Sequence, residues 1–179
     1  APLKENLAAA LLMRAGWSDI AKQGGALIDP MCGSGTFLIE AAMMAADIAP
    51  SMNRQTFGFT HWLQHDQELW ESILTDAEQR KEAGLASFCN DIRGYDGNSR
   101  GLEVTVANIE NAGLDEHIRI AHKPLDQFGK ATADSGLLIT NPPYGARMGE
   151  EEQLVPLYQK LGTVLQKNFI EWRAAVYTG

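Results

Sequence analysis

The sequence predicts an α/β protein in which a mostly parallel sheet is covered by helices on both faces. Short apolar segments alternate with helical patterns along the 179 residues, and a glycine turn directly follows the first apolar segment. Strands that alternate with helices are joined by crossovers, which make the strands parallel and place helices over the sheet. The expected strands are Ala26–Ile28, Ile92–Tyr95, Ile118–Ala121, Gly136–Thr140 and Arg173–Tyr177.

Helical patterns of apolar residues fill most of the intervals between these strands. The segment 50–59 breaks the alternation and is expected to be irregular. We expect Trp62, Trp70 and Trp172 to be core residues. The expected helices are Leu3–Ala15, Thr36–Ile48, Trp62–Ala83, Ser99–Ala112 and Leu154–Asn168.

Composition and charge narrow the classes of function. The net charge of −8 and pI near 4.9 disfavour a domain that grips nucleic acid alone, since Lys and Arg supply most non-specific affinity. No apolar run reaches the roughly 20 residues of a membrane span, so no membrane partner is expected. The two cysteines lack CxxC spacing, which indicates no zinc or other metal site and a reducing, cytoplasmic compartment. We expect residues 1–179 to be one catalytic domain from a larger protein, because the chain starts without Met.

The strongest local feature is the segment Asp29-Pro30-Met31-Cys32-Gly33-Ser34-Gly35-Thr36, which joins a strand to a helix. Gly33 and Gly35 permit a tight turn and let a ligand approach the backbone. Neither a phosphate-loop lysine nor the third glycine of a dinucleotide fingerprint follows. An acid at position 29 would repel phosphate but could accept bonds from a positively charged amino acid moiety. The loop therefore favours S-adenosylmethionine as cofactor.

Two further acids are candidates for the rest of that cofactor. Asp96 ends the second strand, where it could bind both hydroxyls of a ribose or, alternatively, cap the next helix. Asp126 follows the third strand and is a candidate partner of the adenine amino group, although Pro124 leaves the backbone path open.

The fourth strand leads into Asn141-Pro142-Pro143-Tyr144, a pattern suited to methylation of an amine or amide nitrogen. Such nitrogens are poor nucleophiles because the lone pair is delocalised. The Asn141 side-chain oxygen and the Pro142 carbonyl could hold the two hydrogens and orient the nitrogen. Two prolines would fix this turn, and Tyr144 could stack on an extruded base.

With these motifs in this order, the chain resembles the Rossmann-like S-adenosylmethionine-dependent amino-methyltransferases, and more narrowly the THUMP-associated RNA guanine-N2 methyltransferases. The narrower resemblance also rests on segments 2–8 and 57–70. It implies cofactor contacts from Asn6, in the segment that helps cover the cofactor, and from the glycine-loop residues Asp29, Met31, Cys32, Gly33, Gly35 and Thr36. It further implies a large-subunit rRNA guanine as substrate, an upstream RNA-binding domain that is absent here, and a sheet truncated after the fifth strand.

Other functions share the Asn-Pro-Pro-Tyr motif. DNA adenine-N6 methyltransferases and protein glutamine methyltransferases are the alternative enzymes, and a non-catalytic cofactor-binding module is the alternative class. The RNA assignment gains from segments 2–8 and 57–70, not from the motif itself.

Overall fold

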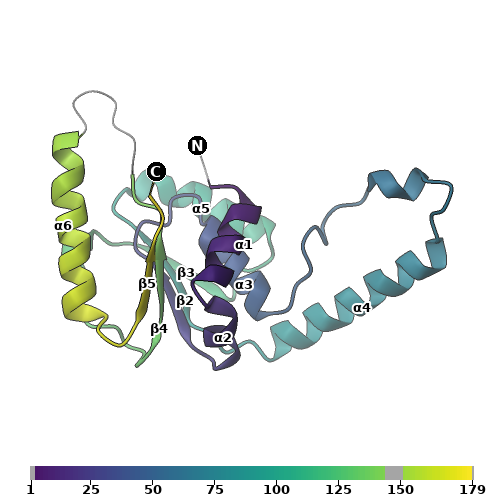
Figure 1. Ribbon diagram of the computed structural model, residues 1–179, viewed down its shortest axis with the longest axis horizontal. Coiled ribbons are helices and arrows are strands. Elements are labelled where there is room, and N and C mark those ends of the chain that lie inside the picture. The colour runs from purple at the N-terminus through teal and green to yellow at the C-terminus, as the bar shows by residue number, and fades with distance from the viewer. Residues whose placement is uncertain (1–2, 144–150, 179) are drawn as a thin grey trace. The chain divides into compact units, whose positions relative to one another are not determined.

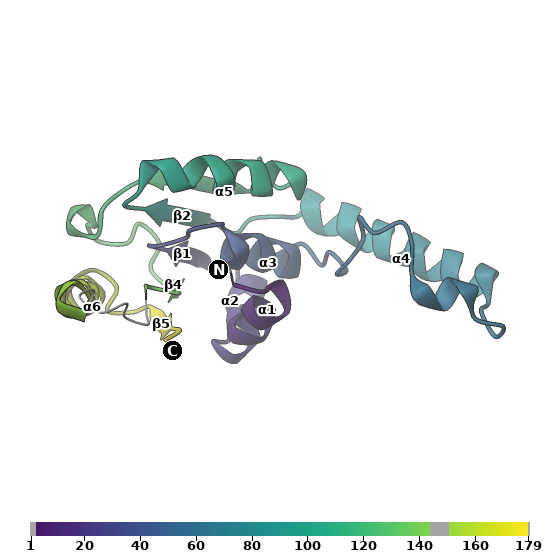
Figure 2. The same ribbon diagram turned by 90° about the horizontal axis from the view of Figure 1, so that it is seen from above.

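The computed structural model describes residues 3–143 and 151–178. Within them, five strands form one parallel sheet in the order β3-β2-β1-β4-β5 (Figures 1 and 2). The predicted α/β class and parallel sheet are therefore confirmed. The strands are β1 (Ala26–Asp29), β2 (Ile92–Asp96), β3 (Ile118–His122), β4 (Gly136–Thr140) and β5 (Arg173–Val176).

Helices cover both faces of this sheet, as the alternation predicted. Figure 1 shows α6 on one side of the strands and α1, α2 and α3 on the other. No helix in the described part of the chain is both long and apolar enough to cross a membrane. The helices are α1 (Glu5–Arg14), α2 (Trp17–Lys22), α3 (Thr36–Ala45), α4 (Gln67–Ala86), α5 (Ser99–Asn111) and α6 (Glu151–Asn168), with 3-10 turns η1 (Gly58–His61) and η2 (Leu125–Gln127).

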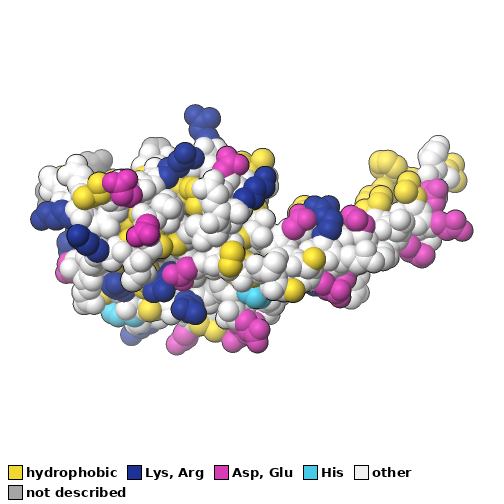
Figure 3. Space-filling model, turned by 90° about the horizontal axis from the view of Figure 1, so that it is seen from below, with side chains coloured by type: hydrophobic (Ala, Val, Ile, Leu, Met, Phe, Trp, Pro, Cys, Tyr) yellow, Lys and Arg dark blue, Asp and Glu magenta, His cyan; other side chains and the backbone are white. Residues whose placement is uncertain are grey.

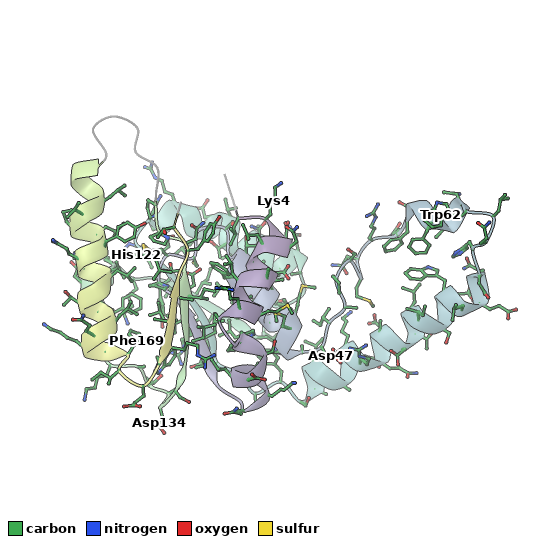
Figure 4. All side chains as sticks on the ribbon, viewed as in Figure 1. Lys4, Asp47, Trp62, His122, Asp134 and Phe169 are labelled. Carbon is green, nitrogen blue, oxygen red and sulfur yellow. The ribbon has the colours of Figure 1, made fainter. Side chains whose placement is uncertain are left out.

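The core lies on both faces of the central strands. All five residues of β4 are buried, and successive side chains of a strand point to opposite faces. Leu138 packs in a cluster with Leu161, Val164, Phe169 and Trp172, and Figure 4 places Phe169 between α6 and the sheet. On the other face, the buried indole of Trp17 donates a hydrogen bond to the Ala41 carbonyl at 2.9 Å, which ties α2 to α3.

Two predicted helices are corrected by the structure. The first ends at Arg14, and Gly16, at φ 82°, turns the chain into the unexpected α2. The helix expected from Trp62 instead begins at Gln67, because the Asp66 side chain caps it by accepting a bond from the Leu69 amide. Trp62 is 68 % exposed, so its assignment to the core is wrong, whereas Trp172 is buried as expected.

The chain divides into two compact units, residues 43–89 and the remainder. Within the smaller unit, Trp70 meets Phe57 and Phe59 edge-on, with ring centroids 5.2 and 4.9 Å apart. Arg80 forms an ion pair with Asp47 on the surface of this unit. Exposed apolar side chains gather at its end together with acidic ones, and Figure 4 labels Trp62 there (Figures 3 and 4).

Candidate active site

The glycine loop after β1 adopts a conformation that ordinary residues avoid. Gly33 and Gly35 have φ values of 50° and 80°, in the left-handed region that glycine enters without strain. The Gly35 amide bonds to the Cys32 carbonyl at 2.8 Å and closes the turn. A Cβ on Gly35 would lie 2.8 Å from the Thr105 methyl, so both backbone geometry and space require glycine here.

Helix α5 holds the loop in place from outside. The buried Thr105 hydroxyl donates to the Gly33 carbonyl, and the Asn108 side-chain amide donates to the Ser34 carbonyl at 2.9 Å. These two bonds engage the Gly33 and Ser34 carbonyls on the side of the loop that meets α5. The sequence offered no sign of these two supports beyond polar residues three apart on one helix face.

Asp96, at the end of β2, faces the loop from the neighbouring strand. One carboxylate oxygen accepts a bond from the Gly33 amide at 3.1 Å, and the other accepts one from the Asn98 amide at 2.8 Å. The side chain of Asn98, rather than Asp96, caps α5. The carboxylate is thereby fixed in direction while its remaining lone pairs stay available to a ligand.

Asp29, in contrast, turns inward and is only 2 % exposed. Burial raises its pKa to about 7, although the bond from the Met31 amide at 3.1 Å opposes this shift. The neighbouring Thr140 hydroxyl also lowers this pKa. Asp29 therefore shapes the loop through Met31 from inside the protein.

A cavity of about 760 Å³ opens beyond the carboxyl ends of the strands. Its size suits a nucleotide-sized ligand, and ligands of parallel α/β sheets bind at this edge. Six expected site residues line it: Met31, Gly33, Asp96, Asp126, Asn141 and Pro142. The remaining residues of the wall are Pro30, Gly97, Asn98, Pro124, Leu125, Pro143, Leu157 and Lys160.

The other expected site residues do not line this cavity. Asn6 lies exposed on α1, and Asp29, Cys32, Gly35 and Thr36 support the loop instead. Burial, followed by the nearby charges of Asp29 and Asp96, raises the pKa of the Cys32 thiol, which suits a packing residue and not a nucleophile. Tyr144 lies outside the described residues.

The cavity wall contains an ion pair. Pro124 precedes η2, and this short turn places Asp126 on the cavity, where its carboxylate lies 3.6 Å from the Lys160 ammonium of α6. Both side chains are about half exposed, so a ligand can compete for either partner. The lysine is 34 residues from the aspartate in sequence, and no local pattern predicts the pair.

Asn141 leaves one polar atom without a partner beside the cavity. Its side-chain oxygen is buried and accepts no hydrogen bond from the described residues. Leaving such an acceptor unpaired costs free energy, which a ligand with an N–H group would recover. The strand end behind it is fixed, since the Tyr177 amide donates to the Thr140 carbonyl at 3.0 Å.

Comparison with known proteins assigns this arrangement to a family. Residues 1–179 match the family described as the RMKL-like methyltransferase domain. The chain belongs to this family. In this RMKL-like domain, the glycine loop, Asp96 of β2 and the Asn-Pro-Pro turn all line one cavity.

Curated relatives match the whole RMKL-like domain. It is 52 % identical to the ribosomal RNA large subunit methyltransferase K/L of Cellvibrio japonicus, over 100 % of this chain and 24 % of that protein. The Methylococcus capsulatus protein of the same name is 51 % identical, again over 100 % of this chain and 24 % of its own length. The chain therefore spans about a quarter of the length of these relatives.

Solved structures share the fold over nearly the whole chain. The crystal structure of SMU.472 complexed with SAH has a TM-score of 0.87 and 33 % identity, over 99 % of this chain and 44 % of that one. A predicted N6-adenine-specific DNA methylase from Listeria monocytogenes gives a TM-score of 0.82 and 32 % identity, over 99 % and 43 %. The expected Rossmann-like methyltransferase fold is thereby confirmed.

Proposed function

We propose that this chain binds S-adenosylmethionine and directs its methyl group to the exocyclic N2 amine of a guanine in large-subunit rRNA. The observation that carries the proposal is the buried, unpaired side-chain oxygen of Asn141, a residue that lines the same cavity as Asp96 and Gly33. The names of the curated relatives and the SAH complex of SMU.472 support the substrate and the cofactor.

The residues around the cavity fit this cofactor in three places. Asp96 would accept the two ribose hydroxyls, and the loop at Gly33 would take the amino acid moiety against exposed backbone. Asp126 would accept the adenine amino group in competition with Lys160. Asn6, Asp29, Met31, Cys32, Gly35 and Thr36 remain proposed contributors, as loop supports or as outer contacts.

Bound S-adenosylmethionine supplies an activated methyl group. The chain supplies orientation: the Asn141 side-chain oxygen and the Pro142 carbonyl accept the two N–H groups of the target amine and aim its lone pair. No strong general base is needed, since the amine becomes acidic once it gains the methyl group. Tyr144 is proposed to stack on the extruded base.

Contacts with RNA must come largely from elsewhere in a longer protein. The chain has a net charge of −8, and phosphate neutralisation needs cationic groups. We propose that residues 1–179 act as one catalytic domain and that an upstream RNA-binding domain holds the rRNA in the cytoplasm. The quarter of the relatives' length spanned by this chain leaves room for such a domain.

A second enzyme function has one specific observation in its favour. The Listeria structure with the same fold is named as a predicted N6-adenine-specific DNA methylase. Asn141 and Pro142 could hold an adenine amine as well as a guanine amine, because both present two N–H groups. Glutamine amides share this property, whereas a non-catalytic module would have no use for the unpaired Asn141 oxygen.

The test uses the full-length protein, labelled S-adenosylmethionine and undermodified large-subunit rRNA, with the product digested and its nucleosides identified by mass. Labelled N2-methylguanosine is the expected result. Label in N6-methyladenine, or transfer only to DNA or protein, would retain the cofactor and overturn the substrate. Absence of transfer to every substrate, with cofactor binding intact, would favour the non-catalytic module.

A further inference from the structure

The Asn-Pro-Pro turn that would hold the target amine has few backbone groups that can form hydrogen bonds with the rest of the protein. Pro142 and Pro143 have no N–H groups, so at these residues only carbonyls can form hydrogen bonds. The Pro142 carbonyl is assigned to the substrate in the proposed function. The Pro143 carbonyl is the remaining backbone anchor at these two positions.

Tyr158 of α6 binds the Pro143 carbonyl. Its phenol donates a hydrogen bond to the Pro143 carbonyl at 3.3 Å. The helix that carries it also lines the cavity, through Leu157 and Lys160. Helix α6 therefore both lines the ligand cavity and forms a hydrogen bond with the end of the Asn-Pro-Pro turn.

The hydrogen bond from Tyr158 restricts the one backbone rotation of Pro143 that the proline ring leaves free. The ring fixes φ of Pro143, whereas the direction of its carbonyl depends on ψ. A donor on a packed helix that fixes this carbonyl also fixes the turn between it and the end of β4. Leu161, three residues beyond Tyr158, is buried in the core cluster, so the donor stands on a rigid element.

We propose that Tyr158 is a positioning residue for methyl transfer: its hydroxyl holds the Pro143 carbonyl so that the Asn141 oxygen and Pro142 carbonyl stay aimed at the target amine. This role rests on the proposed function. Tyr158 does not itself contact the reacting atoms in this proposal, and its side chain is half-buried beside the turn.

The kinetic test compares Tyr158→Phe with wild type in the full-length protein, with steady-state rates measured at saturating cofactor. Removing one hydrogen bond that orients catalytic groups is expected to lower kcat about tenfold. The KM and Kd for S-adenosylmethionine should stay within about twofold. An unchanged kcat, or a parallel loss of cofactor affinity, would overturn the positioning role.

A matched control removes another hydroxyl from the same helix. Thr163 donates to the Gln159 carbonyl within α6 and is exposed, so Thr163→Val should leave kcat unchanged. An equal loss of kcat in Thr163→Val would assign the effect to α6 stability and overturn the proposal. The kcat of each variant is compared with that of wild type on whichever nucleobase wild type methylates. A wrong guanine assignment therefore does not affect the comparison.

A structural readout keeps the inference independent of activity. Crystal structures of wild type and Tyr158→Phe with bound SAH should show the Pro143 carbonyl rotated and the Asn141 side chain displaced in the variant alone. A turn that is superimposable in the two proteins would overturn the proposal, even where neither protein methylates RNA.

Discussion

The carboxylate of Asp96 accepts a hydrogen bond from the amide of Gly33, 63 residues earlier in the chain and 3.1 Å away. A single side chain thus joins the end of β2 to the glycine loop that follows β1. The same group is proposed to bind the cofactor ribose. If it does so, one residue couples the conformation of the loop to the affinity for the cofactor.

Asp96→Ala should weaken S-adenosylmethionine binding by at least about 50-fold, because charge-assisted bonds to two hydroxyls and the loop tether are lost together. Isothermal titration calorimetry measures this directly. Asp96→Asn retains one acceptor oxygen and should lose less. Equal affinity of Asp96→Ala and wild type would contradict the ribose assignment.

Asn141→Ala should reduce kcat by about 100- to 1,000-fold while the cofactor Kd changes less than twofold, since Asn141 is proposed to contact the target amine. Asn108→Ala is the matched control with the opposite expectation. Asn108 supports the Ser34 carbonyl in the loop, so its loss should weaken cofactor binding first. Substantial residual turnover in Asn141→Ala would refute its catalytic role.

The pH dependence of stability should report on Asp29. Burial raises the pKa of this carboxyl to about 7, so between about pH 4 and 7 the folded protein binds a proton that the unfolded chain has released. The stability contributed by this proton is complete at low pH and is lost as pH rises through about 7. In the absence of cofactor, Asp29→Asn should remove this loss. Melting temperatures at pH 5 to 8 that fall equally in both proteins would refute it.

Gly94→Ala should destabilise the protein by about 1–3 kcal/mol through overpacking. A Cβ at this position would lie 2.3 Å from Leu38 Cδ1 and 3.1 Å from the Cys32 sulfur, behind the glycine loop. Denaturant unfolding compares it with Gly101→Ala on α5, where a Cβ meets nothing within 4 Å and helix propensity should improve. A Gly94→Ala variant as stable as Gly101→Ala would show that the strand yields easily.

The elements of the fold that short-range sequence patterns determine were predicted from the sequence. The five strands and the glycine loop were located from apolar runs and turn residues, and family resemblance related the motifs to one another. The apolar residues Trp62 and Leu63 misled because they extend the periodicity of α4 in sequence, whereas the cap at Asp66 ends the helix first. The start of a helix is determined by the capping residue, which the periodicity of apolar residues does not reveal.

The supports of the site were beyond sequence reasoning for a different reason. Thr105 and Asn108 bond to loop carbonyls more than 70 residues away, and Tyr158 bonds to a proline carbonyl on the preceding turn. Carbonyl acceptors are present at every residue, so no residue type marks them as targets. Only the crossing of α5 and α6 past the loops creates these contacts.

The order of strands in the sheet has a consequence for biosynthesis. β1 lies between β2 and β4, so the strand made first acquires its second neighbour only after about a hundred further residues have been translated. The cavity walls run from Pro30 to Lys160 along the chain. A nascent polypeptide that still lacks α6 cannot bury the face of its central strand that packs against this helix, and its cavity wall is incomplete, so a ligand cannot yet stabilise it. Chaperones that shield apolar strands are thus expected to engage this protein during translation, before its own ligand can.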